Sequence, residues 1–144
     1  MDNDPRLELL YKIIGYWTSQ AISAAPRLQI ADHLQHGPKC TDELASKLSA
    51  HPLNLYRLLR ALASQGIFKE LSGRRFELTA MAERLSLSHP ESLYGLAVMN
   101  GSDWHWQPWG SLFKSIKTGK TAFDHCHGER MFDYLDGHPE NSNV

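Results

Sequence analysis

The chain has 144 residues, of which 42% are hydrophobic and 22% are charged, with a mean hydropathy of -0.41; this is the composition of a soluble single-domain protein. Fifteen Lys and Arg against sixteen Asp and Glu give a net charge of -1, so no overall positive field draws the chain to nucleic acid or anionic lipid. An acidic start with no basic-then-apolar leader, and no apolar run approaching about 18 residues, predict a cytoplasmic protein without membrane contact.

The first predicted element is a long amphipathic helix. Its apolar positions recur every three or four residues, as Leu7, Leu10, Ile14, Trp17, Ala21 and Ala24. We expect Pro26 to interrupt this helix and a second short helix to follow before Gly37-Pro38. The apolar face either packs across its own domain or contacts a second chain, and we favour the second chain because the face exceeds what one small core requires.

The middle of the chain predicts a winged helix. Thr41 is expected to cap a helix over residues 42–48, and Pro52 to open a longer helix that ends at Gly66. Residues 67–78 then predict two short strands around a tight turn. Consecutive helices followed by a β-hairpin are typical of the winged-helix fold.

More helices are predicted after the hairpin. Thr79 is expected to cap one through Leu87, and Ser88-His-Pro-Glu91 to form a capping box for the next. Two later helices are expected, one ending at Gly119 and one carrying Met131, Phe132 and Leu135. The fold class is therefore mainly α, in a single unit over residues 1–144. Its expected parts are a helical segment at about 5–36, a winged-helix core at about 27–80 and C-terminal helices at about 80–138.

Sequence motifs for catalysis are missing. No two of the ten glycines are separated by a single residue, so the Gly-x-Gly turn of dinucleotide and adenosyl cofactor sites is absent. A Gly-x-Ser-x-Gly elbow, a P-loop and His-Glu-x-x-His are absent too. His125-Cys126-His127 is the one local cluster of metal-ligand types, and a closed zinc site would need a second pair. We therefore predict no catalytic residue and no metal, with Cys40 and Cys126 as reduced thiols.

Three tryptophans, Trp104, Trp106 and Trp109, crowd a short stretch, and two interpretations remain open. They could be core side chains, because Trp buries a large area. They could instead form the aromatic wall of a pocket for a flat ligand, with contacts from Met99, Asn100 and His105.

The winged helix also raises a nucleic-acid hypothesis. Tyr56, Arg57 and Arg60 would enter a major groove, and Arg74-Arg75 would meet phosphate. From Thr41 to Leu78, however, six cations and four acids leave a net charge of only +2, which is a weak footprint for DNA. A small winged-helix transcription regulator is therefore the alternative function.

Several segments in order along the chain resemble one family. They are residues 37–45, 51–66, 75–79, 104–110, 119–123 and 132–140. The chain resembles the N-terminal region of S-adenosylmethionine-dependent O-methyltransferases, which include plant caffeic acid methyltransferases and bacterial hydroxyneurosporene and polyketide methyltransferases. The resemblance implies an intertwined homodimer and a lid over a small hydroxylated aromatic or polyketide acceptor. S-adenosyl-L-methionine and the catalytic base would belong to a Rossmann-like domain absent from this sequence, so we expect the chain to bind no cofactor and to be inactive alone.

The same resemblance implies roles for individual residues. Substrate contacts would come from Met99, Asn100, His105, Met131, Leu135 and Asn141, with Trp17 and Gln20 contributed by the first helix of the partner. The dimer interface would include Leu7, Leu10, Ile14, Trp17 and Ala21. Plant members carry His at the position of Leu135 and an aromatic residue at that of Asn141, so an acceptor of different shape is expected here.

Overall fold

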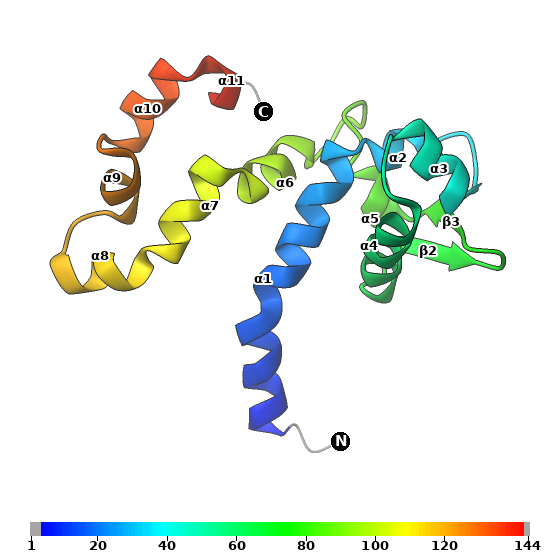
Figure 1. Cartoon of the computed structure of the whole chain (residues 1–144), viewed down its shortest axis with the longest axis horizontal. Coiled ribbons are helices and arrows are strands. Elements are labelled where there is room, and N and C mark those ends of the chain that lie inside the picture. The colour runs from blue at the N-terminus through cyan, green and yellow to red at the C-terminus, as the bar shows by residue number, and fades with distance from the viewer. Residues whose placement is uncertain (1–3, 143–144) are drawn as a thin grey trace.

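The computed structural model describes residues 4–142, which form eleven helices and three short strands and so confirm the mainly α prediction. Figure 1 shows three parts side by side: a winged-helix body, a long first helix beside it, and an arm of short helices on the far side of that helix.

Helix α1 (Pro5–Arg27) begins where the Asp4 side chain accepts a hydrogen bond of 2.9 Å from the amide of Arg6. It continues through Pro26 and ends one residue later, so the expected interruption was wrong. Proline is tolerated there because only the last turn is affected, and Leu28 donates to Ala24 to close the helix. Gln29 then turns the chain with a left-handed φ of 53° into the short α2 (Ile30–Leu34).

The winged helix is confirmed. Its elements are β1 (Lys39–Cys40), α3 (Thr41–Lys47), α4 (Pro52–Ser64), β2 (Phe68–Leu71) and β3 (Arg75–Leu78). The strands form an antiparallel sheet in the order β1-β3-β2. The turn between β2 and β3 needs left-handed backbone, which Gly73 (φ 72°) and Arg74 (φ 54°) supply.

One hydrophobic core lies inside the winged helix, between the end of α1 and residue 85. Leu55, Leu59 and Leu62 of α4 are buried in it, as their helical spacing predicts, against Phe68 and Phe76 of the hairpin. Among the described residues, Trp104 and Pro108 are the buried apolar side chains beyond that range. The helices after α6 therefore have little core of their own.

Thr41 does not cap α3, contrary to the sequence prediction. Cys40 occupies the cap position, and the Thr41 hydroxyl donates to the carbonyl of Arg74 at 3.0 Å. The side chain is buried against the wing, so it joins α3 to the hairpin instead of satisfying its own first turn.

The helix after the hairpin is shorter than predicted. Thr79 does cap α5 (Ala80–Glu83), accepting from Ala82 at 3.3 Å, but the helix stops before Leu87. Beyond its end, buried Ser86 donates to a carboxylate oxygen of Asp32 at 2.5 Å and so ties the chain to α2.

The predicted capping box at residues 88–91 was also wrong. Helix α6 (Tyr94–Gly101) starts later, after Leu93, without a side-chain cap. Glu91 pairs with Arg84 instead, across the loop.

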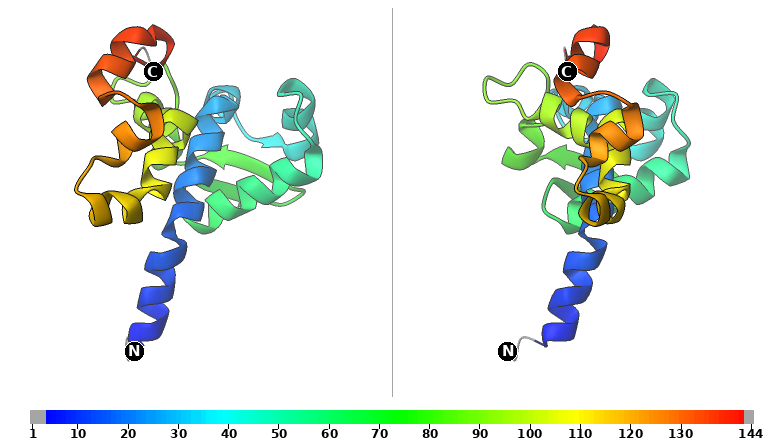
Figure 2. Two further views of the ribbon diagram at one scale, coloured as in Figure 1. Left: turned by 60° about the vertical axis from the view of Figure 1, so that its left-hand side comes forward. Right: turned by 90° about the vertical axis from the view of Figure 1, so that its left-hand side faces the viewer.

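Short helices complete the chain. They are α7 (Asp103–Gly110), α8 (Leu112–Thr118), α9 (Ala122–His127), α10 (Met131–Gly137) and α11 (Pro139–Ser142). Gly119 ends α8 in a left-handed conformation, as predicted, and the last predicted helix is followed by the additional α11. Figure 2 shows this C-terminal arm, residues 103–142, lying on the opposite side of α1 from α4.

Candidate functional site

The N-terminal half of α1 projects from the body of the molecule (Figures 1 and 2). Leu7, Leu10 and Trp17 of the predicted interface stripe are exposed, with 58% of Trp17 accessible. Ile14 is half-buried, and Ala21 packs against the winged-helix core. The stripe is therefore anchored at one end and uncovered at the other.

The reverse side of this half-helix is apolar too. Leu9, Ile13 and Tyr16 are exposed there. The polar strip is narrow, with Glu8 and Lys12 joined by an ion pair of 3.2 Å. A helix that is apolar nearly all round is normally buried, yet apart from the contact of Tyr16 with Trp106 these side chains are exposed on two faces.

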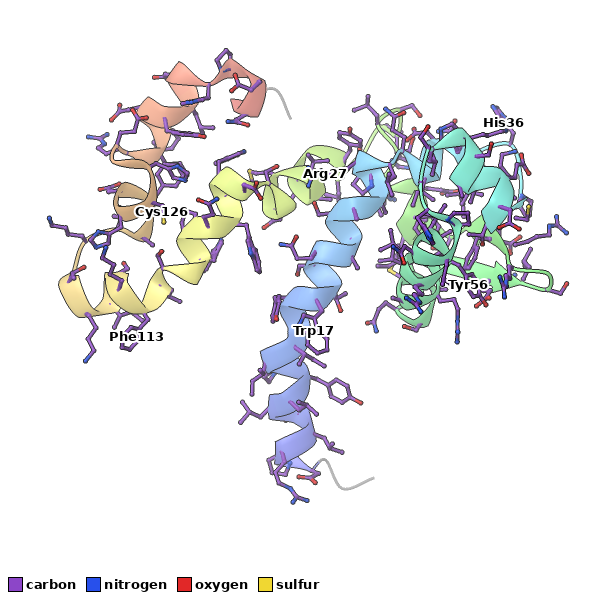
Figure 3. The ribbon with its side chains drawn as sticks, in the orientation of Figure 1. Trp17, Arg27, His36, Tyr56, Phe113 and Cys126 are labelled. Atoms are coloured by element: carbon purple, nitrogen blue, oxygen red, sulfur yellow. The ribbon has the colours of Figure 1, made fainter. Side chains whose placement is uncertain are left out.

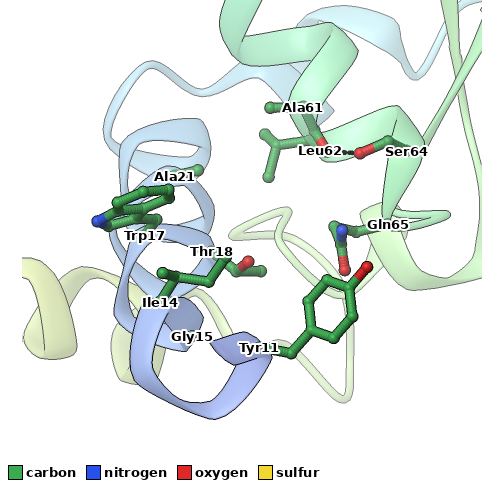
Figure 4. A pocket seen from close by; sticks show the side chains of 10 residues that line it. All are labelled: Tyr11, Ile14, Gly15, Trp17, Thr18, Ala21, Ala61, Leu62, Ser64 and Gln65. Atoms are coloured by element: carbon green, nitrogen blue, oxygen red, sulfur yellow. Dashed lines mark hydrogen bonds between the residues drawn. The ribbon is translucent and has the colours of Figure 1, made fainter. Parts of the chain in front are cut away.

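A groove of about 650 Å³ separates α1 from the C-terminal end of α4. Figure 4 shows its two walls, with Tyr11 of α1 and Gln65, the residue after α4, pointing towards one another at one end. The lining residues are Tyr11, Ile14, Gly15, Trp17, Thr18, Ala21, Ala61, Leu62, Ser64 and Gln65. None carries a formal charge, so the groove suits an uncharged occupant.

The second half of α1 packs closely against α6 at Gly101. A Cβ atom at this position would lie 1.9 Å from the Ser23 hydroxyl oxygen and 2.4 Å from the Ser23 Cβ. Gln20 lies beside the same glycine, with its Oε1 3.5 Å from that position. Sequence reasoning missed Gly101 and Ser23, since neither residue stands out by type or spacing.

Several buried side-chain polar atoms of α1 and α7 have no hydrogen-bond partner. Within residues 4–142, Gln20 Nε2, Ser23 Oγ, Trp104 Nε1 and His105 Nδ1 are buried and accept or donate no hydrogen bond. Buried polar groups are normally satisfied, so this group is unusual for a structural core.

The pocket positions predicted on α6 and α7 lie near the same contact. Met99 and Asn100 are half-buried on α6, and the Asn100 amide donates to the carbonyl of Leu96 at 2.8 Å. His105 is half-buried on α7, with its ring edge-on to Trp104 at 5.5 Å. Gln20 lies beside Gly101 of α6, whereas Trp17 lines the groove between α1 and α4.

The remaining predicted pocket positions belong to the arm. Met131 and Leu135 lie on α10 and Asn141 lies on α11. The arm is held by an aromatic cluster of Trp104, Phe123, His127, Tyr134 and His138. His127 Nε2 is also 2.9 Å from the carbonyl oxygen of Trp104. The two sets of pocket positions are therefore connected through the first turn of α7.

The three tryptophans lie in three environments, so neither interpretation fits them all. Trp104 is buried in the aromatic cluster, as a core residue would be. Trp106 packs on Tyr16 of α1 with ring centroids 5.9 Å apart, and Trp109 is exposed.

The His125-Cys126-His127 segment is engaged in other contacts. His125 Nε2 lies 2.9 Å from the Thr118 hydroxyl oxygen, and the Cys126 sulfur lies 3.3 Å from the Ser111 hydroxyl oxygen. Between residues 4 and 142, no three His, Cys, Asp or Glu side chains converge as metal ligands would.

The side chains of the nucleic-acid hypothesis contact the wing. Tyr56 donates to Glu70 at 2.9 Å, and Arg60 lies 3.8 Å from the same carboxylate. The Arg74 guanidinium stacks over the Tyr56 ring at 4.8 Å. An acidic residue at the centre of this group opposes phosphate, so the arrangement favours a structural role.

Burial lowers the pKa of His105 below its ordinary value of 6.5. The folded chain therefore favours the neutral imidazole more than the unfolded chain does, and acid favours the unfolded state, which binds the proton more readily. We expect the His105 resonance in NMR titration to have a lower midpoint in the folded chain than in urea, and the free energy of unfolding to fall as the pH drops below the ordinary value. His105→Gln should reduce that fall. Equal midpoints in the two states would contradict the assignment.

Taken together, a winged-helix core, a long helix whose apolar N-terminal half is exposed, and an arm of short helices form the arrangement expected of an association module. The sequence profile of the O-methyltransferase dimerisation domain matches residues 11–88, more than half of the chain. The chain belongs to this O-methyltransferase dimerisation domain family.

Individual relatives agree with that assignment. Phenazine O-methyltransferase PhzM of Lysobacter antibioticus is 38% identical over 94% of this chain and 40% of its own length. The crystal structure of LaPhzM superposes with a TM-score of 0.92 at 36% identity, covering 96% of this chain and 41% of that one. An O-methyltransferase from neocarzinostatin biosynthesis, solved with S-adenosyl-L-homocysteine and 1,4-dihydroxy-2-naphthoic acid, gives a TM-score of 0.74 at 30% identity over 88% of this chain and 39% of that one. The chain therefore spans about two fifths of the length of these relatives.

Helix α1 is the longest in the part of the chain that the structure describes, and neither it nor any shorter helix there could span a bilayer.

Proposed function

We propose that the chain forms a homodimer through α1 and acts as the dimerisation and substrate-lid part of a cytoplasmic S-adenosylmethionine-dependent O-methyltransferase. The acceptor would be a small hydroxylated aromatic or polyketide-type natural product. The observation that carries this proposal is the uncovered apolar stripe of α1, beginning at Leu7 and ending against the core at Ala21. The family of the chain and the small aromatic acceptor in a related structure support it.

The lid would use two sets of side chains. Gln20 lies at the α1–α6 contact, Met99 and Asn100 lie on α6, and His105 lies on α7. These side chains would meet one side of the acceptor, together with Trp17 on the stripe. The second set lies on the arm, as Met131, Leu135 and Asn141. The unpartnered Gln20 and His105 nitrogens support this role, since a ligand oxygen or hydroxyl would satisfy them.

Bond-making would depend on groups outside this sequence. S-adenosyl-L-methionine supplies a methyl group to a phenolic or enolic oxygen, and a base takes the proton of that oxygen. We assign neither cofactor binding nor the base to any residue of this chain. Its contribution would be to exclude water and orient the acceptor, so we expect no methyl transfer by the chain alone.

Sedimentation equilibrium tests the dimer. We expect the 144-residue chain to sediment as a dimer, and Leu10→Glu and Ile14→Glu each to weaken association at least about tenfold, because a charge would be buried in an apolar contact. Lys12→Glu is the matched control, since it changes charge on the polar strip of the same helix.

A folded wild-type monomer would contradict the proposal. So would equal weakening by Lys12→Glu and Leu10→Glu, because that result would indicate general loss of helix stability and not loss of a specific face.

A further inference from the structure

We infer that the groove between α1 and α4 of one copy receives helix α8 of a second copy, and that the exchange is reciprocal. The inference rests on the proposed homodimer and specifies which surfaces meet in it.

The groove belongs to the surface already assigned to dimerisation. Ile14, Trp17 and Ala21 of its α1 wall are part of the interface stripe, and the α4 wall is Ala61, Leu62, Ser64 and Gln65. Both walls fall within the residues that match the dimerisation profile. A second copy is therefore the occupant that continues the same interface.

Helix α8 carries the apolar surface that fits. Phe113 and Ile116 are each 74% exposed, the highest value among the large apolar side chains of residues 4–142. With Leu112 they occupy positions i, i+1 and i+4, and so project from one side of the helix. Figure 3 shows Phe113 projecting outward from α8.

The charged residues of α8 are compatible with insertion of its apolar side into the groove. Lys114 lies on the opposite side of α8 from the apolar side chains, while the Lys117 ammonium lies 5.7 Å from the Phe113 ring centroid at the edge of the patch. Insertion of the three apolar side chains into the uncharged groove leaves both lysines in solvent.

The same chain does not fill its own groove. Helices α8 and α4 lie on opposite sides of α1 in Figure 1 and in the first view of Figure 2. In a two-fold symmetric pair, each copy donates one α8 and offers one groove, so both contacts form at once and the assembly closes at two chains.

A cysteine pair tests this arrangement. Ala61→Cys in the groove and Ile116→Cys on α8 are placed together in a chain whose Cys40 and Cys126 are replaced by Ser. We expect mild oxidation to give a covalent dimer, with neither single-cysteine variant cross-linking. Ser46→Cys on exposed α3, combined with Ile116→Cys, is the matched control and should remain uncrosslinked.

The outcomes separate this inference from the proposed function. A chain that sediments as a dimer but forms no Ala61–Ile116 cross-link would overturn the inference and leave the homodimer standing. A ladder of cross-linked species would also overturn it, because a closed pair forms none. A monomeric chain would overturn both.

A second pair of variants measures the contribution of α8. Phe113→Ser should raise the dimer dissociation constant at least about tenfold, as expected for an aromatic anchor in a groove. Lys114→Ser, one residue away on the opposite side, should change it less than about twofold. Equal effects of the two substitutions would contradict the inference.

Discussion

Gly101→Ala is expected to lower the free energy of unfolding by about 2–3 kcal/mol, although it adds a single methyl group. The methyl would lie 1.9 Å from the Ser23 hydroxyl oxygen and 2.4 Å from the Ser23 Cβ. Ser23 is buried on α1, so α1 and α6 must separate to admit the methyl. Urea denaturation at a fixed chain concentration measures the loss.

Two further variants make this result specific to the contact. Gly110→Ala has open space around it in α7, so it should keep or slightly increase stability, by up to about 1 kcal/mol. Combining Gly101→Ala with Ser23→Gly removes both clashing atoms and should restore most of the loss. Equal destabilisation by the two alanine variants, or failure of the double variant to recover, would refute the steric explanation.

Phe76→Ala is expected to cost about 3–5 kcal/mol, because it empties the centre of the winged-helix core. Phe76 lies in the middle strand of the sheet, is fully buried, and meets the Tyr56 ring edge-on at 6.1 Å. Thermal and urea unfolding of the variant should both shift. The Phe132 side chain on α10 is exposed, so the same substitution at that position serves as the control.

Phe132→Ala should change the free energy of unfolding by less than about 0.5 kcal/mol, since its ring is already in water. A comparable loss in the two alanine variants would mean that the arm shares the core of the winged helix. We expect a much smaller loss for Phe132→Ala, because Trp104 is the one large side chain that is buried in the described part of the arm.

The winged helix was predictable because its determinants are local. Pro52 at the start of α4, Gly66 after its end and Gly73 in the hairpin turn fix backbone conformation within a few residues. Leucines recur at helical spacing along α4, and Leu55, Leu59 and Leu62 among them are buried in the core. Such signals require no knowledge of what packs against them.

The wrong predictions share a different cause. Thr41 and Glu91 each carry a side chain suited to a helix start, yet each bonds to a group distant in sequence or across a loop. Local propensity assigned both to helix starts, and contacts to Arg74 and Arg84 decided otherwise. The helix predicted through Leu87 likewise ends early, in the stretch where Ser86 bonds to Asp32.

The candidate site was predictable only in part. The exposed stripe of α1 follows from periodicity, whereas the pocket positions came from a resemblance and stay predictions. Gly101 and Ser23 were not predictable, because a close approach between two helices depends on how they cross and leaves no pattern in either helix alone.

The uneven burial of α1 gives one continuous helix two levels of local stability. Its last turns are held at Ser23 and Ala25, while its first turns have mainly their own backbone bonds and the exposed pair of Glu8 and Lys12. A helical segment of about 12–15 residues without packing is marginal in water. In a separated monomer this segment therefore frays, and its amide protons exchange rapidly. Association and ordering of the segment then form a single coupled equilibrium, in which part of the contact energy offsets the entropy of forming the helix.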